Sequence, residues 1–140
     1  MNRKANDRSK SVVDADGRVT RPAAIHVISK AARRIARAWS LTPDEAARLL
    51  DVPDVVWARI AAGSYAEPFE AGQGKRAGLL VALYEDGHRA FEGPLATTWV
   101  MRPNTGPDFG GRRPVDLMLD DGIEGMRIVL AHLQYIWYGK

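Results

Sequence analysis

The side chains most often used in catalysis are few and dispersed in this sequence. His26, His88 and His132 each lie in a separate predicted helix, and none has a second histidine three or four residues away. The sequence contains no cysteine, which excludes disulfides, thiolate ligands and cysteine nucleophiles. It also contains no G-x-S-x-G, H-E-x-x-H or P-loop motif. We therefore expect no enzyme activity, no catalytic residue, no metal site and no cofactor.

One segment combines glycine with arginine in a way that could bind phosphate. Residues 106–114 read Gly-Pro-Asp-Phe-Gly-Gly-Arg-Arg-Pro and come just before a predicted helix, where backbone N–H groups can bind anions. Glycines at such a place also permit tight turns between two helices. The spacing matches no nucleotide-binding motif, so we favour the turn.

The last residues are unusually aromatic. Tyr135, Trp137 and Tyr138 stand within the final six residues, although chain ends are normally polar and frayed. These rings either dock on their own domain or insert into a partner, where Trp and Tyr are favoured anchors. A free chain end can enter a blind pocket without threading a loop through it.

Hydrophobic periodicity predicts that helices position these residues. The chain shows no strand pattern and reads as all-α, with helices over about 24–39, 43–50, 55–62, 75–91, 95–101, 114–119 and 122–138. The clearest start is at Thr42, where Pro43 and Glu45 complete a capping box. The second and third helices flank a tight turn and form a helix-turn-helix candidate.

Positive charge is concentrated in the first quarter of the chain. The formal charge of +3 combines +7 in residues 1–37 with −4 in residues 38–140. Residues 1–22 are polar and basic and are predicted to form a disordered tail. Lys30, Arg33, Arg34 and Arg37 then share the polar face of the first helix. This face is either simply solvated or contacts phosphates.

The length of 140 residues suits one domain or two very small ones. No apolar run is long enough for a membrane span, and the N-terminus lacks the apolar core of a signal peptide. We therefore expect a cytoplasmic protein that does not interact with membranes.

The C-terminal sequence resembles a known family. Trp99 is followed by Arg102-Pro103-Asn104, then by residues 109–118, Phe-Gly-Gly-Arg-Arg-Pro-Val-Asp-Leu-Met, and by residues 122–126, Gly-Ile-Glu-Gly-Met. This pattern is similar to the C-terminal toxin-binding domain of Xre/MbcA/ParS antitoxins, and with the preceding helix it extends over about residues 68–140. Residues 45–52 resemble the Xre-like helix-turn-helix that usually precedes this domain.

The resemblance implies a domain organisation. It divides the chain into the basic tail (1–22), an Xre-like helix-turn-helix region (23–63) and a helical toxin-binding domain (64–140).

The resemblance also implies a function. These antitoxins neutralise RES-domain toxins, which consume NAD or transfer ADP-ribose, by occluding the active-site cleft with their C-terminal portion. We predict such an antitoxin of a type II toxin–antitoxin pair, forming a hetero-oligomeric complex with its toxin and a homo-oligomer itself. The predicted toxin-binding residues are Arg112, Arg113, Tyr135, Trp137, Tyr138 and Lys140.

The alternative function is a helix-turn-helix transcriptional regulator that autoregulates its operon. Asp51 and Pro53 stand where the family commonly has a glycine and a serine or threonine cap, and residues 54–62 contain only Arg59 as a basic group. Base recognition normally needs several Arg, Asn or Gln side chains. The third helix is then a packing or dimerisation element with Trp57 buried. The candidate contacts to operator DNA are Lys30, Arg33, Arg34, Arg37 and Arg59.

Overall fold

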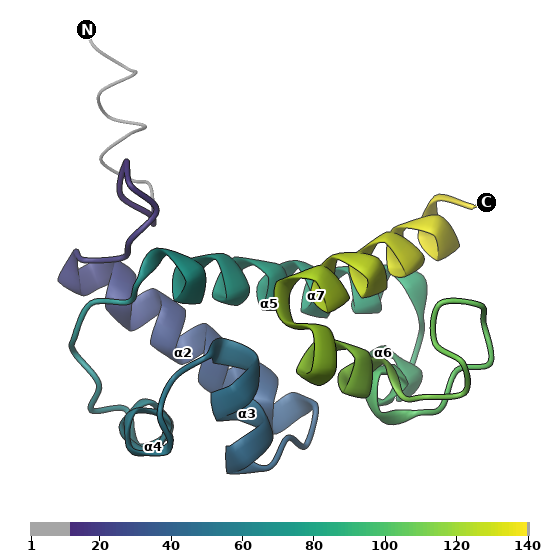
Figure 1. Cartoon of the computed structure of the whole chain (residues 1–140), viewed down its shortest axis with the longest axis horizontal. Helices are drawn as coiled ribbons and strands as arrows, with labels where there is room; N and C mark the ends of the chain where they lie inside the picture. The colour runs from purple at the N-terminus through teal and green to yellow at the C-terminus, as the bar shows by residue number, and fades with distance from the viewer. Residues whose placement is uncertain (1–11, 140) are drawn as a thin grey trace, which may run out of the picture.

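The computed structural model describes residues 12–139, and helices dominate them (Figure 1). They are α2 (Pro22–Ala38), α3 (Pro43–Leu50), α4 (Asp54–Ala62), α5 (Ala71–Ala90), α6 (Leu95–Thr98), the 3-10 helix η1 (Trp99–Met101) and α7 (Pro114–Tyr138). In this part of the chain β-structure is confined to one isolated bridge, so the predicted all-α class is confirmed. None of these helices combines the length and the apolar character that crossing a bilayer requires.

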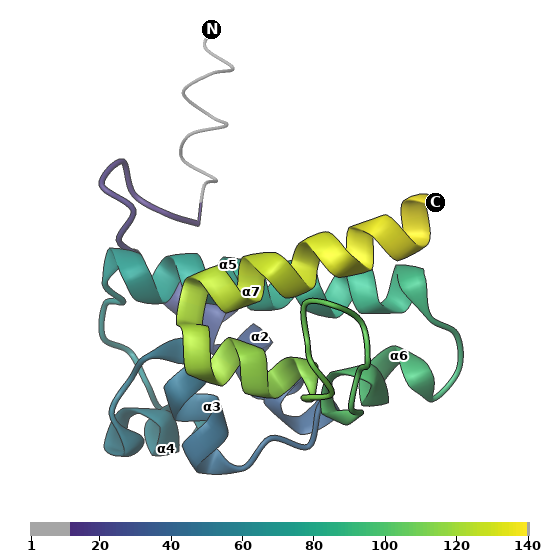
Figure 2. The same ribbon diagram turned by 45° about the vertical axis from the view of Figure 1, so that its right-hand side comes forward.

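The core is built around the pair formed by α5 and α7, which lie side by side in both views (Figures 1 and 2). Leu83, Met126, Val129 and Leu133 are fully buried between these helices and their neighbours. The same buried cluster continues into α2, α3 and α4. The division predicted at residues 63 and 64 therefore does not interrupt the core.

The start of α3 follows from local sequence. The Glu45 amide donates to the Thr42 hydroxyl oxygen at 3.1 Å, and the Thr42 amide donates to the Glu45 carboxylate at 2.9 Å. This is the predicted capping box, in which the two side chains each satisfy a backbone donor of the first turn. The prediction at Thr42 is confirmed.

The start of α5 lies four residues before the predicted position. The Glu70 amide donates to the Gln73 side chain at 2.8 Å and begins the helix at Ala71. Gly72 and Gly74 suggested a loop, yet both lie inside the helix. Gly74 is buried, and an added Cβ there would lie only 3.2 Å from the Val19 side chain, so the glycine allows a close contact.

The segment before α2 packs on the helices. Val19 and Phe69 form an antiparallel bridge, in which each amide donates to the carbonyl of the other residue at 3.0 and 2.9 Å. Both side chains are completely buried. The prediction of a disordered tail is therefore wrong for this segment, because a hydrophobic residue in a polar run finds a distant partner. Residues 1–11 lie outside the described part.

The two helices predicted at 114–119 and 122–138 form one element with a kink. Gly122 has φ 60° and ψ −133°, a conformation that residues with a Cβ avoid. Three residues later, a Cβ on Gly125 would lie 2.3 Å from the Leu117 carbonyl oxygen. These two glycines let the second arm of α7 turn sharply and pass close to the end of the first.

Candidate protein-interaction surface

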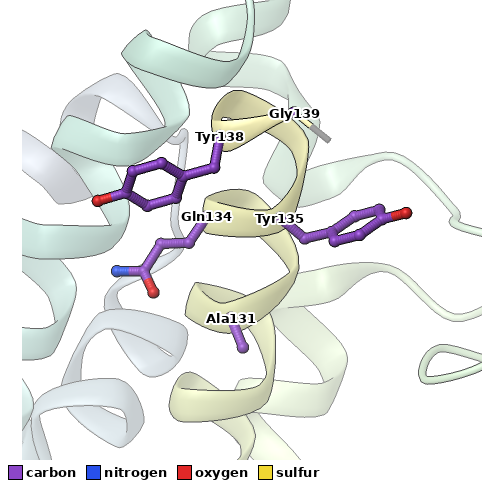
Figure 3. Close-up of a pocket in the computed structure, with 5 residues that line it drawn as sticks. All are labelled: Ala131, Gln134, Tyr135, Tyr138 and Gly139. Atoms are coloured by element: carbon purple, nitrogen blue, oxygen red, sulfur yellow. The ribbon is translucent and has the colours of Figure 1, made fainter.

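The end of α7 exposes two tyrosines. Tyr135 and Tyr138 are each 74% exposed, and their side chains extend in different directions from the end of α7 (Figure 3). With Ala131, Gln134 and Gly139 they line an open depression of about 410 Å³. Large aromatic side chains with this exposure at a chain end are suited to bury themselves in another protein.

Trp137 lies between these tyrosines in sequence but docks on its own domain. Its ring stacks on the Tyr138 ring, with centroids 4.2 Å apart and an interplanar angle of 21°. The Arg89 guanidinium lies 5.4 Å from the Trp137 ring centroid, within the range of a cation–π interaction. The indole Nε1 is buried without a hydrogen-bond partner in the described structure. The Trp137 ring therefore packs against the exposed Tyr138 ring on one side and contacts Arg89 of α5.

The buried Asp86 carboxylate links the C-terminal ends of α5 and α7. Asp86 is only 5% exposed and forms an ion pair with Arg89. Its other oxygen accepts a hydrogen bond from the Gln134 amide at 3.3 Å. The sequence analysis missed this network, although an acidic residue within the apolar pattern of a helix is a signal that could have found it.

The loop between η1 and α7 is organised by Asn104. The Asn104 backbone exchanges hydrogen bonds with the Arg112 carbonyl at 3.0 Å and the Gly111 amide at 2.9 Å. Its side-chain oxygen accepts from the Gly106 amide at 2.7 Å, and its Nδ2 lies 3.3 Å from Nε2 of His132. Every polar group of Asn104 thus has a partner in the loop or on α7, which supports the interpretation of segment 106–114 as a turn.

The same loop is fastened to α7 by a ring contact. Phe109 is buried and meets the His132 ring edge-on, with centroids 4.9 Å apart. Burial lowers the pKa of His132, and the nearby Asp108 carboxylate opposes this shift. Tyr135 follows His132 by three residues, so the two side chains are neighbours on the surface of α7.

The two arginines predicted to bind toxin differ in their availability. Arg113 donates through Nη2 and Nε to the Asp116 carboxylate at 2.8 and 3.1 Å, and these hydrogen bonds lower the pKa of Asp116. Arg112 is exposed, with Nη1 3.4 Å from Asp120 and Nε bonded to the Phe109 carbonyl. The Arg113 guanidinium is thus largely engaged by Asp116, whereas the exposed Arg112 guanidinium is accessible to a partner. Lys140, also predicted here, lies outside the described residues.

The residues predicted to bind DNA also divide into two groups. Arg33 donates to the Ile60 carbonyl at 2.9 Å and so caps the C-terminal end of α4. The Arg59 guanidinium lies 5.5 Å from the Tyr65 ring centroid and 3.5 Å from the Ser64 carbonyl. Lys30, Arg34 and Arg37 are exposed on α2. Trp57 is buried, as predicted for a packing role of α4.

Two exposed aromatic side chains on a fixed helix end are suited to contact another protein. Residues 86–139 match the family model of the antitoxin Xre/MbcA/ParS C-terminal toxin-binding domain. The predicted resemblance is confirmed over this range, and the domain family indicates a toxin-binding antitoxin whose partner is a protein toxin. Neither the curated proteins nor the solved structures gave a match. The resemblance of residues 45–52 to an Xre-like helix-turn-helix stays a prediction.

Proposed function

We propose that this protein neutralises a RES-domain toxin by placing the end of α7 in the toxin's active-site cleft. The observation that supports this proposal is the exposure of Tyr135 and Tyr138 on a helix end that is already fixed. Arg89, Asp86 and Gln134 hold the last turns of α7 before any partner binds. A preorganised anchor loses little conformational entropy on binding, so most of its buried surface contributes to affinity.

This mode of inhibition needs no catalytic group in the antitoxin. A RES toxin consumes NAD, so a protein that fills the cleft prevents NAD from entering. In our proposal the two tyrosines supply the apolar contact, and Arg112 supplies a charged contact at the rim. Charged rim contacts mainly affect the rate of association, whereas buried aromatic anchors determine how long the complex lasts.

The direct test measures NAD consumption by a purified RES-domain toxin titrated with the purified protein. We expect activity to fall in proportion to added protein until the toxin is saturated. A stable complex that still consumes NAD at the full rate would contradict occlusion of the cleft. A complex formed with a toxin of another class would support the antitoxin function but contradict the RES assignment.

A double variant locates the contact. Tyr135→Ala combined with Tyr138→Ala should weaken the complex by more than about 30-fold, because truncating an interface anchor typically costs about 2 kcal/mol or more. Val55→Ala is the matched control, since Val55 is also exposed but lies on α4. Unchanged affinity and unchanged inhibition by the double variant would rule out this end of α7 as the contact.

A further inference from the structure

The loop between η1 and α7 is joined to α7 by a side-chain hydrogen bond whose direction the geometry fixes. Oδ1 of Asn104 lies 2.7 Å from the Gly106 backbone nitrogen, and because a backbone N–H can only donate, Oδ1 is the acceptor. The amide of Asn104 therefore turns its Nδ2 towards His132, where Nδ2 lies 3.3 Å from Nε2. Nδ2 is a donor and not an acceptor, so Nε2 of His132 accepts this hydrogen bond.

This hydrogen bond requires a neutral His132 ring. A ring nitrogen accepts only when it carries no proton, so the single proton of the neutral ring lies on Nδ1. In the imidazolium form both ring nitrogens are donors, and the N–H of Nε2 would face the NH₂ group of Asn104. Rotation of the Asn104 amide does not solve this conflict, because it would place Nδ2 against the Gly106 N–H.

We propose that the Asn104–His132 hydrogen bond is a proton-controlled latch, which fastens the loop to α7 while His132 is neutral and releases it when Nε2 takes up a proton. The latch lies where the two sides of the loop meet. The Asn104 amide donates to the Arg112 carbonyl at 3.0 Å, and the Asn104 carbonyl accepts from the Gly111 amide at 2.9 Å. A change in the position of Asn104 is therefore passed directly to Arg112.

The groups around His132 determine the pH at which the latch opens. Burial favours the neutral ring and lowers the pKa of His132, whereas the Asp108 carboxylate of the same loop favours the charged ring. Arg112, also on the loop, pairs with Asp120 at 3.4 Å. The residues three and four positions from His132 on α7 are Ile, Val, Tyr and Ile, which bring no charge. The latch should therefore open below pH 6.5, the ordinary pKa of histidine.

The neighbouring helices do not supply a competing charge pair. The residues of η1 are Trp, Val and Met. In the last turns of α5, Asp86 pairs with Arg89, and Nδ1 of His88 lies 2.9 Å from the carbonyl of the preceding turn. Glu85 is exposed. Once protonated, the His132 ring is thus attracted by the Asp108 carboxylate and repelled by the Asn104 amide, and both act from the loop itself.

The consequence for binding rests on the proposed function, in which Arg112 contacts the rim of the toxin's cleft. Nε of Arg112 donates to the Phe109 carbonyl at 3.2 Å, and the Phe109 ring meets the His132 ring edge-on. The orientation of Arg112 therefore depends on a loop residue that packs on the latch histidine. Charged rim contacts act mainly on the association rate, so the protonated form should associate with the toxin more slowly.

The latch is tested on the full chain alone by NMR, which follows the His132 ring and the Gly106 and Gly111 amides between about pH 7.5 and about pH 5. Protection of these amides is expressed relative to an unstructured chain at the same pH. It should fall by about 2- to 12-fold with the midpoint of the His132 titration, because one hydrogen bond contributes a factor of this size. Unchanged protection while His132 titrates would overturn the proposal.

Two substitutions should change this pH response in different ways. His132→Gln places an uncharged amide oxygen near the position of Nε2, so loop protection should no longer depend on pH. Asn104→Asp keeps an acceptor for the Gly106 amide but turns a second acceptor towards His132. The loop should then be fastened by the protonated ring, so protection should rise as the pH falls, and the His132 titration should move to higher pH.

The matched control is His26→Gln, which removes an exposed histidine from α2 and should respond to pH as the parent chain does. Circular dichroism should show that all three variants are folded. If acid lowered loop protection in Asn104→Asp as it does in the parent chain, the loop would be responding to overall charge and the latch would be disproved. The same conclusion would follow from an unaltered pH response in His132→Gln.

The effect on binding is measured as the association rate with a purified RES-domain toxin at about pH 7.5 and about pH 5.5. Titration of the toxin itself affects the parent chain and His132→Gln equally, so the comparison isolates the latch. We expect similar rates at the higher pH and a several-fold slower rate for the parent chain at the lower pH. Equal rates at the lower pH would show that the latch does not control binding. A toxin that bound neither protein would contradict the proposed function, whereas the NMR measurements would still decide the latch.

Discussion

Gly125 lies directly against the Leu117 carbonyl, so close that a Cβ on Gly125 would be 2.3 Å from that oxygen. The contact joins the two arms of α7 across the kink at Gly122. It explains why a helix that otherwise carries large apolar residues has glycine at both positions. As a whole, α7 packs against both α5 and α3.

Gly125→Ala should destabilise the protein by about 1–3 kcal/mol, because the added methyl group forces the two arms apart. Urea denaturation monitored by circular dichroism would measure the change. Gly78→Ala is the matched control: it also lies inside a helix, with open space around its Cβ position. That substitution should stabilise by up to about 1 kcal/mol. If both substitutions had the same effect, crowding at Gly125 would not be the cause.

Stability should fall as the pH drops below about 6.5, in part through His132. Burial lowers the pKa of His132 below its ordinary value of 6.5. The unfolded chain therefore takes up this proton first as the pH falls, and the free energy of unfolding decreases until the folded state is protonated as well. Thermal melts of the parent chain and of His132→Gln between about pH 7.5 and pH 5 would measure this.

The His132→Gln variant should lose part of the pH dependence and also some stability at neutral pH, because it lacks the Phe109 ring contact. The comparison is His26→Gln, which changes an exposed histidine on α2. Its pH dependence should match that of the parent chain more closely. Identical pH profiles for the parent chain and His132→Gln would show that His132 does not contribute.

Asp86→Ala should loosen the end of α7 and weaken toxin binding without touching the exposed tyrosines. The substitution leaves Arg89 and Gln134 without their shared acceptor, a change that typically costs about 1–3 kcal/mol. Amide hydrogen exchange should be faster in the last turns of α7, whereas exchange in α3 should not change. A slower complex association with normal exchange would instead indicate a direct electrostatic effect on the partner.

Val19→Ala should destabilise the fold by about 1–2 kcal/mol, because Val19 is fully buried against Phe69. An exposed valine provides the comparison: Val55→Ala should stay within about 0.5 kcal/mol of the parent chain. Equal effects of the two substitutions would mean that burial of the Val19 side chain does not contribute to stability.

Local signals in the sequence predicted much of the fold. The Thr42–Glu45 capping box, the end of α4 at Ala62 and the order of the helices all depend on neighbouring residues. The early start of α5 was missed because Gly72 and Gly74 are typical of loops, and the reason for Gly74 lies in contact with a segment 55 residues away at Val19.

The candidate sites were harder to predict, because charge is visible in a sequence and its partners are not. Arg33 belongs to a basic helix face by spacing, yet its guanidinium binds the Ile60 carbonyl. Trp137 belongs to an aromatic cluster by sequence, yet Arg89 and the packing of α5 hold it in place. Of the three aromatic residues predicted to bind toxin, Tyr135 and Tyr138 are highly exposed, whereas Trp137 is half-buried.

The bridge between Val19 and Phe69 has a practical consequence for handling this protein. It fixes the incoming chain at the start of α5, whereas Trp137 packs on Arg89 at the opposite end of the same helix (Figure 1). A 20-residue helix spans about 30 Å, so Val19 and Trp137 lie at well-separated places. A label attached near residue 12 lies far along α5 from Tyr135 and Tyr138, whereas a label attached after Gly139 adjoins these two tyrosines.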